Sequence, residues 1–315
     1  MGTVRAFAGS LPMSALDQAS IHFSAESLRV LNLALAFLMF AVSLFIEREP
    51  LAKLRRQPRG LLVGLVSQWL YMPLMTVALI LLLKPPPGLA LGMLLVSACP
   101  GGNVSNYLSM LARANVVLGI SLVTISTLTA AVATPGLFAL TARAVGAAGA
   151  LPELHVDLVG MLWTVLAIVA LPLFLGGLFR HYAPALALRI RQPLRIAAGL
   201  LLLAFIVGGF AGNYRLFLEH IEALFGWVFL LNALAIAGGY GLGWLFRLPE
   251  ADRRALAIET GIHNSGLGLV LIFNFFDGSG PMALIAAWWG VWHILAGGVV
   301  AAVWSRIPPR TGLEA

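Results

Sequence analysis

Charged residues are scarce in this sequence, and their scarcity excludes an ordinary soluble domain. Only 10% of the 315 residues are charged, whereas 60% are hydrophobic, and the mean hydropathy is +0.93. A soluble domain of this length does not need so apolar a composition to bury its core. The composition therefore predicts a polytopic membrane protein without a large domain outside the lipid bilayer.

Cysteine is also nearly absent: Cys99 stands alone, which excludes a disulfide within the chain. The formal net charge is +7, but the basic residues occur singly or in pairs between apolar stretches. This pattern is typical of membrane topology signals and not of a nucleic-acid-binding face. The first 24 residues contain no apolar core with a cleavage site, and Ala6 breaks the myristoylation pattern, so neither a signal peptide nor that lipid anchor is expected.

Nine apolar segments are long enough to cross a bilayer, which takes about 20 helical residues. They cover approximately 29–46, 60–83, 88–112, 115–142, 156–179, 194–211, 221–246, 253–276 and 282–304. The loops after the odd-numbered spans and the C-terminus lie on one side of the membrane, and 15 of the 20 lysines and arginines are on that side. The other 5 are on the opposite side. This asymmetry predicts an external N-terminus and a cytoplasmic C-terminus in the plasma (inner) membrane.

Two of these spans are interrupted by glycine or proline. Pro100, Gly101 and Gly102 break the third span, and Gly261 and Gly266 break the eighth. Interrupted segments at corresponding places in two halves indicate the binding site of a secondary transporter built from inverted repeats. The alternative is a pair of kinks that serve helix packing.

Glu259 is the only acidic residue well inside a predicted span. Burying a carboxylate there costs at least about 2.5–3.5 kcal/mol on insertion scales. We therefore expect Glu259 to pair with a cation, to take up a proton or to line a water-filled cavity. If the turn stays helical, His263 shares its face and can form a proton-accepting pair with it. The alternative is a histidine that only hydrogen-bonds within the core.

Six short motifs are similar to those of a known family, the bile acid:sodium symporters. The motifs are QWLYMP (68–73), CPGGNVSN (99–106), LARAN (111–115), STL (126–128), ETGIHNSG (259–266) and VWH (291–293). The resemblance extends from about residue 29 to residue 305. It implies an all-α transporter with inverted repeats of five helices, the first helix being absent, as in the nine-helix members.

The resemblance also implies a division of the chain into domains. An external tail, 1–28, would precede a single transporter domain, 29–305, and a cytoplasmic tail, 306–315, would follow it. Within the transporter domain, a panel domain would comprise about 29–46, 156–179 and 194–211. A core domain, about 60–142 and 221–304, would contain two broken helices that cross each other.

The family's first sodium site is only partly matched. Ser105, Asn106 and Glu259 occupy positions of side-chain oxygen donors. Two further hydroxyl positions are Gly119 and Val123 here, and neither residue offers a side-chain oxygen. The hydroxyl groups of the neighbouring Ser121 and Thr124 are displaced from the expected helical face.

The second sodium site keeps Gln68, Glu259 and the backbone carbonyl groups of Thr260 and Ile262, but the family's second glutamine is His263. Imidazole nitrogen is a poor ligand for a hard alkali cation. The remaining donors predict at most one cation site, at this second position. We expect transport to depend weakly on sodium and more on pH, with Glu259 and His263 titrating as a pair.

By the same resemblance, Asn103, Asn264 and His293 would line a substrate crevice. The expected substrate is a bile-acid-like or other small amphipathic carboxylate, and no cofactor besides Na+ or H+ is implied. Arg189 and its neighbours on the sixth span are interpreted as topology signals or an anionic-lipid site. Neither a His-Glu-x-x-His nor a Gly-x-Ser-x-Gly pattern is present, which argues against an enzyme. The alternative function is a sodium-independent facilitator, or a scaffold or receptor that does not transport.

Overall fold

The computed structural model describes residues 25–45, 58–151, 157–212 and 214–309, and this part of the chain is almost entirely helical. Within it, six helical segments are long and apolar enough to cross a bilayer. They are Glu26–Ser43, Pro58–Leu83, Val116–Ala147, Leu158–Tyr182, Leu224–Leu245 and Gly280–Ser305. The chain is therefore a multi-pass integral membrane protein.

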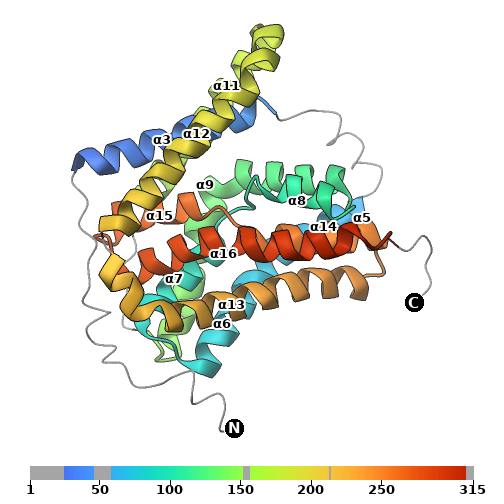
Figure 1. Cartoon of the computed structure of the whole chain (residues 1–315). Helices are drawn as coiled ribbons and strands as arrows, with labels where there is room; N and C mark the ends of the chain where they lie inside the picture. Colours follow the sequence, from blue (N-terminus) through green and yellow to red (C-terminus); the bar gives the residue numbers. More distant parts are fainter. Residues whose placement is uncertain (1–24, 46–57, 152–156, 213, 310–315) are drawn as a thin grey trace.

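One layer of the molecule combines the first described helix with helices from the middle of the chain. It contains α3 (Ala25–Ser43), α10 (Leu158–Val165), the π-helix η2 (Leu166–Ala170), α11 (Leu171–Tyr182) and α12 (Pro184–Gly212). α3 packs against α11, α12 and η2. Figure 1 shows α3, α11 and α12 above the other helices, so this layer covers one side of the remaining structure.

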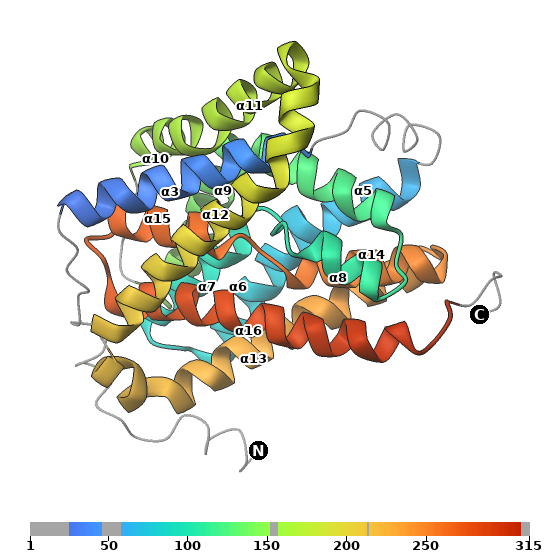
Figure 2. The same ribbon diagram turned by 45° about the horizontal axis from the view of Figure 1, so that its top comes forward.

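The remaining helices form the larger part of the molecule. They are α5 (Pro58–Val66), the π-helix η1 (Ser67–Tyr71), α6 (Met72–Leu83), α7 (Pro87–Ala98), α8 (Ser105–Leu111), α9 (Val116–Ala147), α13 (Tyr214–Leu245), α14 (Glu250–Gly261), α15 (Ser265–Phe275) and α16 (Gly280–Ser305). α13 packs along α14, while α16 packs against α7, α13 and α15 (Figure 2). Residues 89–98 of α7 are all buried, so this apolar helix lies inside the protein and not in lipid.

α12 differs most from its expected bounds. The sequence predicted a helix over 194–211, whereas α12 begins at Pro184 and ends at Gly212. Arg189, Arg191 and Arg195 interrupt the apolar pattern but not the helix, because arginine is a good helix former. α13 likewise begins at Tyr214 and not at 221. Both α12 and α13 are therefore longer than the apolar spans predicted for them.

The predicted interruptions of the third and eighth spans are confirmed. α7 ends at Ala98 and α8 begins at Ser105, while α14 ends at Gly261 and α15 begins at Ser265. The two breaks are joined to each other by backbone hydrogen bonds. The N–H of Gly102 donates to the carbonyl of Ile262 (2.9 Å), and the N–H of Asn264 donates to the carbonyl of Pro100 (2.8 Å). These bonds satisfy backbone groups that would otherwise be unpaired at membrane depth.

Gly102 is required by this close approach. A Cβ atom at Gly102 would lie 3.1 Å from the carbonyl oxygen of His263 and 3.2 Å from the side chain of Ile262. Neither neighbour moves freely, because the carbonyl belongs to the opposite break and Ile262 is fully buried. The glycine therefore lets the two breaks hydrogen-bond to each other.

The guanidinium group of Arg254 caps the C-terminal ends of two helices. Its side chain is only 2% exposed, and its guanidinium donates to the carbonyl groups of Ala112, Trp304 and Ile307 and to the carboxylate of Glu250. These carbonyls lie at the C-terminal ends of α8 and α16, where helix carbonyl groups lack partners within the helix. Arg254 thus joins three helices at one surface of the molecule and is more than a topology signal.

Gly176 lets α11 approach α3 closely, and its replacement is expected to loosen this layer. A Cβ atom at Gly176 would overlap the side chain of Ser43 and lie 2.8 Å from the carbonyl oxygen of Phe40. Gly176→Ala should therefore lower the free energy of unfolding by about 1–3 kcal/mol. Gly177→Ala is the matched control, because a Cβ atom there meets nothing within 4 Å. Thermal unfolding in detergent measures both, and equal melting temperatures would contradict the packing described here.

Candidate functional site

A carboxylate lies at the centre of the larger group of helices. Glu259 occupies the last turn of α14 and is fully buried. Neither of its carboxylate oxygens has a hydrogen-bond partner of normal geometry among the described residues. The hydroxyl of Ser105, at the start of α8, lies beside the carboxylate. A buried anion of this kind needs a cation or a proton to offset its desolvation.

Near Gly119 of α9, two further side-chain oxygen atoms lie close to Glu259 Oε1. A Cβ atom at Gly119 would lie 2.9 Å from Glu259 Oε1, 3.5 Å from Ser109 Oγ and 3.7 Å from Asn106 Oδ1. The oxygens of Ser105, Asn106 and Ser109 are buried and lack hydrogen-bond partners among the described residues. The absent side chain of Gly119 therefore leaves a recess walled by oxygen atoms from α8 and α14. We call these four residues, Ser105, Asn106, Ser109 and Glu259, the oxygen cluster.

The second oxygen of the carboxylate faces η1. A Cβ atom at Gly101 would lie 3.3 Å from Glu259 Oε2 and 3.2 Å from Gln68 Nε2. The amide of Gln68 donates to the backbone carbonyl of Glu259 (3.3 Å), and the hydroxyl groups of Ser67 and Thr260 are hydrogen-bonded to each other. Gln68 Oε1 is buried without a partner in the described part of the chain. A π-helical turn, a feature often found at functional sites, thus brings both Ser67 and Gln68 to α14.

The expectation that His263 shares a helical face with Glu259 is wrong. α14 ends at Gly261, and Ile262 is extended, so His263 lies in the break, paired with Gly101 in an isolated β-bridge. Its ring nitrogens contact backbone carbonyls instead: Nδ1 lies 3.1 Å from Val96 O, and Nε2 lies 3.0 Å from Thr260 O. The Thr260 carbonyl, an expected sodium ligand, is therefore already in contact with imidazole.

The hydroxyl groups next to the missing donors are hydrogen-bonded within α9. Ser121 donates to the carbonyl of Val117 and Thr124 to that of Ile120, so both bond to their own helix. Ser109 is the hydroxyl that does lie at the recess, and sequence reasoning missed it. Its signal was spacing: Ser109 is four residues after Ser105, which places both on one face of α8.

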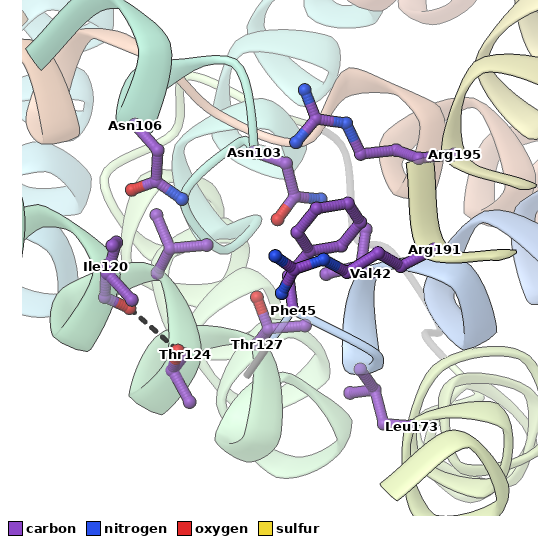
Figure 3. A pocket seen from close by; sticks show the side chains of 11 residues that line it. Val42, Phe45, Asn103, Asn106, Ile120, Thr124, Thr127, Leu173, Arg191 and Arg195 are labelled. Carbon is purple, nitrogen blue, oxygen red and sulfur yellow. Dashed lines mark hydrogen bonds between the residues drawn. The ribbon is translucent and has the colours of Figure 1, made fainter. Parts of the chain in front are cut away.

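A cavity of about 290 Å³ lies between the two groups of helices (Figure 3). Its wall consists of Val42, Phe45, Asn103, Asn106, Ile120, Val123, Thr124, Thr127, Leu173, Arg191 and Arg195. Asn103 is thus at the cavity, and Asn106 belongs both to the cavity wall and to the oxygen cluster. Asn264 and His293 are not among the described residues that line it. Asn264 caps α15 by accepting from the N–H of Leu267 (3.1 Å), and His293 is buried beside the ring of Trp289.

Two arginines of α12 also line this cavity, although the sequence had indicated only a role in topology or lipid binding. The Cζ atoms of Arg191 and Arg195 lie 5.1 and 5.0 Å from the centroid of the Phe45 ring. This distance is typical of a cation–π contact. Sequence reasoning could not find them because their partner, Phe45, follows the end of α3 and is about 150 residues earlier in the chain.

Comparison with known proteins assigns the family. The model of the Sodium Bile acid symporter family matches residues 32–220. The "uncharacterized sodium-dependent transporter YocS" of Bacillus subtilis is 29% identical over 88% of this chain and 83% of its own length. The "probable sodium/metabolite cotransporter BASS1, chloroplastic" of Arabidopsis thaliana is 29% identical over 88% of this chain and 67% of its own length. The "probable sodium/metabolite cotransporter BASS2, chloroplastic" of rice (Oryza sativa subsp. japonica) is 31% identical over 87% of this chain and 63% of its own length. The chain therefore belongs to the sodium bile acid symporter family, which is a family of transporters and not of enzymes.

Proposed function

We propose that this protein is a secondary active transporter that moves a small organic anion by alternating access, coupled to a cation held at the oxygen cluster. The observation that carries the proposal is the fully buried Glu259, whose carboxylate lies with three other side-chain oxygens next to the contact between two helix breaks. Breaks of this kind mark the substrate and ion sites of inverted-repeat transporters.

The proposed architecture has nine membrane spans in two inverted repeats, with the two broken helices crossing at the site. The panel domain comprises α3, α10 with η2 and α11, and α12, and the core domain comprises the other helices. The close packing of α3 with α11, α12 and η2 supports this division. The N-terminal tail, 1–28, is placed outside the plasma (inner) membrane and the C-terminal tail, 306–315, in the cytoplasm. Residues 1–24 and 310–315 lie outside the described residues.

The chemistry of the oxygen cluster fits a hard cation such as Na+, which prefers carboxylate, amide and hydroxyl oxygens. Ser105, Asn106 and Glu259 are the family donors that remain, and Ser109 replaces a donor lost at Gly119. A cation bound there would neutralise the carboxylate and offset its burial.

A second sodium ion is not part of this proposal. Of the second set of donors, the Thr260 carbonyl already contacts the His263 ring, and only Gln68 Oε1 and the Glu259 carboxylate are without a partner among the described residues. We therefore favour one cation at the first position over the second position that the sequence favoured. The carbonyl of Ile262 accepts from the N–H of Gly102, so it too already has a partner.

Uptake into proteoliposomes tests this function. A sodium gradient, inside low, should drive accumulation of small carboxylates, and the sodium concentration for half-maximal uptake should rise as the pH falls. The reason is that a proton and a cation compete for the same carboxylate. Equilibration without accumulation would support a facilitator, and absence of uptake would support a scaffold or receptor. If a pH gradient drove accumulation in the absence of sodium, the coupling ion would be the proton and not Na+.

A further inference from the structure

The last turn of α14, which carries Glu259, is held in place by side chains from other helices. α14 ends at Gly261, and Ile262 is extended. The last carbonyl groups of a helix lack partners within that helix. Here the carbonyl of Glu259 accepts from Nε2 of Gln68 (3.3 Å), and the carbonyl of Gly261 accepts from Nδ2 of Asn232 (2.8 Å). The position of this turn therefore depends on η1 and α13 as well as on α14.

A chain of two hydroxyl groups makes a further contact with this turn. The hydroxyl of Thr260 donates to the carbonyl of Leu256 in its own helix (2.7 Å). Because a hydroxyl has only one proton, Ser67 is the donor in the hydrogen bond between Ser67 and Thr260. Both side chains are fully buried. The Ser67 hydroxyl is therefore directed at the residue that follows Glu259.

The turn that carries Ser67 is itself anchored. At the end of η1, the hydroxyl of Tyr71 donates to the carbonyl of Leu234 on α13 (2.9 Å). A Cβ atom at Gly238 of α13 would overlap the Tyr71 ring, so the ring lies directly against that helix. η1 thus contacts α14 through its first residue and α13 through its last. Ser67 extends from a fixed support and can hold α14 in place.

Holding Thr260 also holds Glu259, because consecutive side chains of a helix point about 100° apart and move together. Thr260 points to η1, whereas Glu259 points to α8 and α9. The carboxylate has little room to move, since a Cβ atom at Gly119 would lie only 2.9 Å from Glu259 Oε1. A binding site works only when its groups are held within about 0.5 Å of their productive positions. A small rotation of the last turn would therefore misplace the carboxylate.

We propose that Ser67 is a positioning residue of the cation site, which fixes the carboxylate of Glu259 through its hydrogen bond to Thr260. This inference rests on the proposed function, in which Glu259 binds the cation, and it adds a layer of support around that ligand. The Ser67 proton is directed to Thr260, so Ser67 acts on the cation by orienting its ligand. Outer partners of this kind set the geometry and the affinity of metal sites.

Equilibrium binding of radioactive sodium to the purified protein tests this role. Ser67→Ala should raise the sodium dissociation constant by at least about tenfold. Thr260→Val removes the other hydroxyl of the same bond and should have a similar effect. The double variant should bind sodium as Thr260→Val alone does, because both substitutions break one interaction. Additive effects would show that Ser67 acts by another route and would overturn the assignment.

Two matched controls remove a buried hydroxyl that bonds only to its own helix among the described residues. The hydroxyl of Thr76 donates to the carbonyl of Met72, and that of Ser97 donates to the carbonyl of Leu94 (both 2.8 Å). Thr76→Val and Ser97→Ala should therefore keep the sodium affinity of the wild type. Melting temperatures show which variants are folded at the temperature of the binding measurement. Equal sodium affinities of the wild type and folded Ser67→Ala would overturn the positioning role.

An infrared measurement in sodium-free buffer separates this role from the proposed function. The absorption band of the Glu259 carboxyl group is assigned by its loss in Glu259→Gln. The band should shift in Ser67→Ala and in Thr260→Val, because the carboxyl group then meets different neighbours, and it should stay unchanged in both controls. An unchanged band in Ser67→Ala and Thr260→Val would overturn the positioning role whether or not sodium binds. A wild type that binds no sodium would contradict the proposed cation site, and the band would still decide the role of Ser67.

Discussion

Glu259→Gln is expected to abolish accumulation of substrate against a gradient while leaving the protein folded and in the membrane. Glutamine has nearly the same shape as glutamate and is cheaper to bury because it carries no charge. The variant therefore keeps the packing around the last turn of α14 but loses the charge that attracts a cation. Sodium-driven uptake into proteoliposomes measures the loss, and a melting temperature at or above that of the wild type shows that the fold survives.

Asp157→Asn is the control for this change of acid to amide. Asp157 caps α10 by accepting from the N–H of Gly160 (2.9 Å), and asparagine caps a helix equally well. Uptake by this variant should equal that of the wild type. Normal accumulation by Glu259→Gln, with sodium dependence retained, would remove the carboxylate from the coupling mechanism.

Ser109→Ala is expected to raise the sodium concentration for half-maximal uptake by about tenfold, equivalent to about 1.4 kcal/mol of binding free energy. The hydroxyl of Ser109 is buried at the recess and has no partner among the described residues. A hard cation that loses an oxygen ligand must accept water or a gap in its place. The maximal rate at saturating sodium should change much less than the half-saturating concentration.

Ser97→Ala separates this role from a general effect of removing a buried hydroxyl. Ser97 is equally buried, but its hydroxyl donates to the carbonyl of Leu94 in its own helix (2.8 Å). Sodium dependence should therefore be unchanged in Ser97→Ala. If both alanine variants shifted the sodium dependence equally, Ser109 would not be a ligand.

The membrane class and the two helix breaks could be predicted from the sequence because each has a local cause. A soluble domain of this length does not need 60% hydrophobic residues to bury its core. Pro100, Gly101 and Gly102 together form a local helix-breaking sequence, because proline removes a backbone hydrogen bond and glycine is a poor helix former. Glu259 also stands out locally, because a carboxylate in an apolar span carries a large desolvation cost.

The features that sequence reasoning missed depend on tertiary contacts. Where α14 ends, and hence where the His263 ring points, depends on hydrogen bonds to the other break. Ser109 gains its importance from Gly119, and the α12 arginines gain theirs from Phe45, which follows the end of α3. Periodicity shows which residues share a face of one helix, but it does not show which face of another helix they meet.

Equilibrium binding of radioactive sodium to the purified protein tests the central claim most directly, because it requires neither a known substrate nor a sealed membrane. The wild type should bind about one sodium ion per chain in a saturable manner, as expected for a single set of oxygen donors. Lower pH should weaken that binding, and Glu259→Gln should eliminate it. Undiminished sodium binding by Glu259→Gln, or no saturable binding by the wild type, would contradict a cation site at the oxygen cluster.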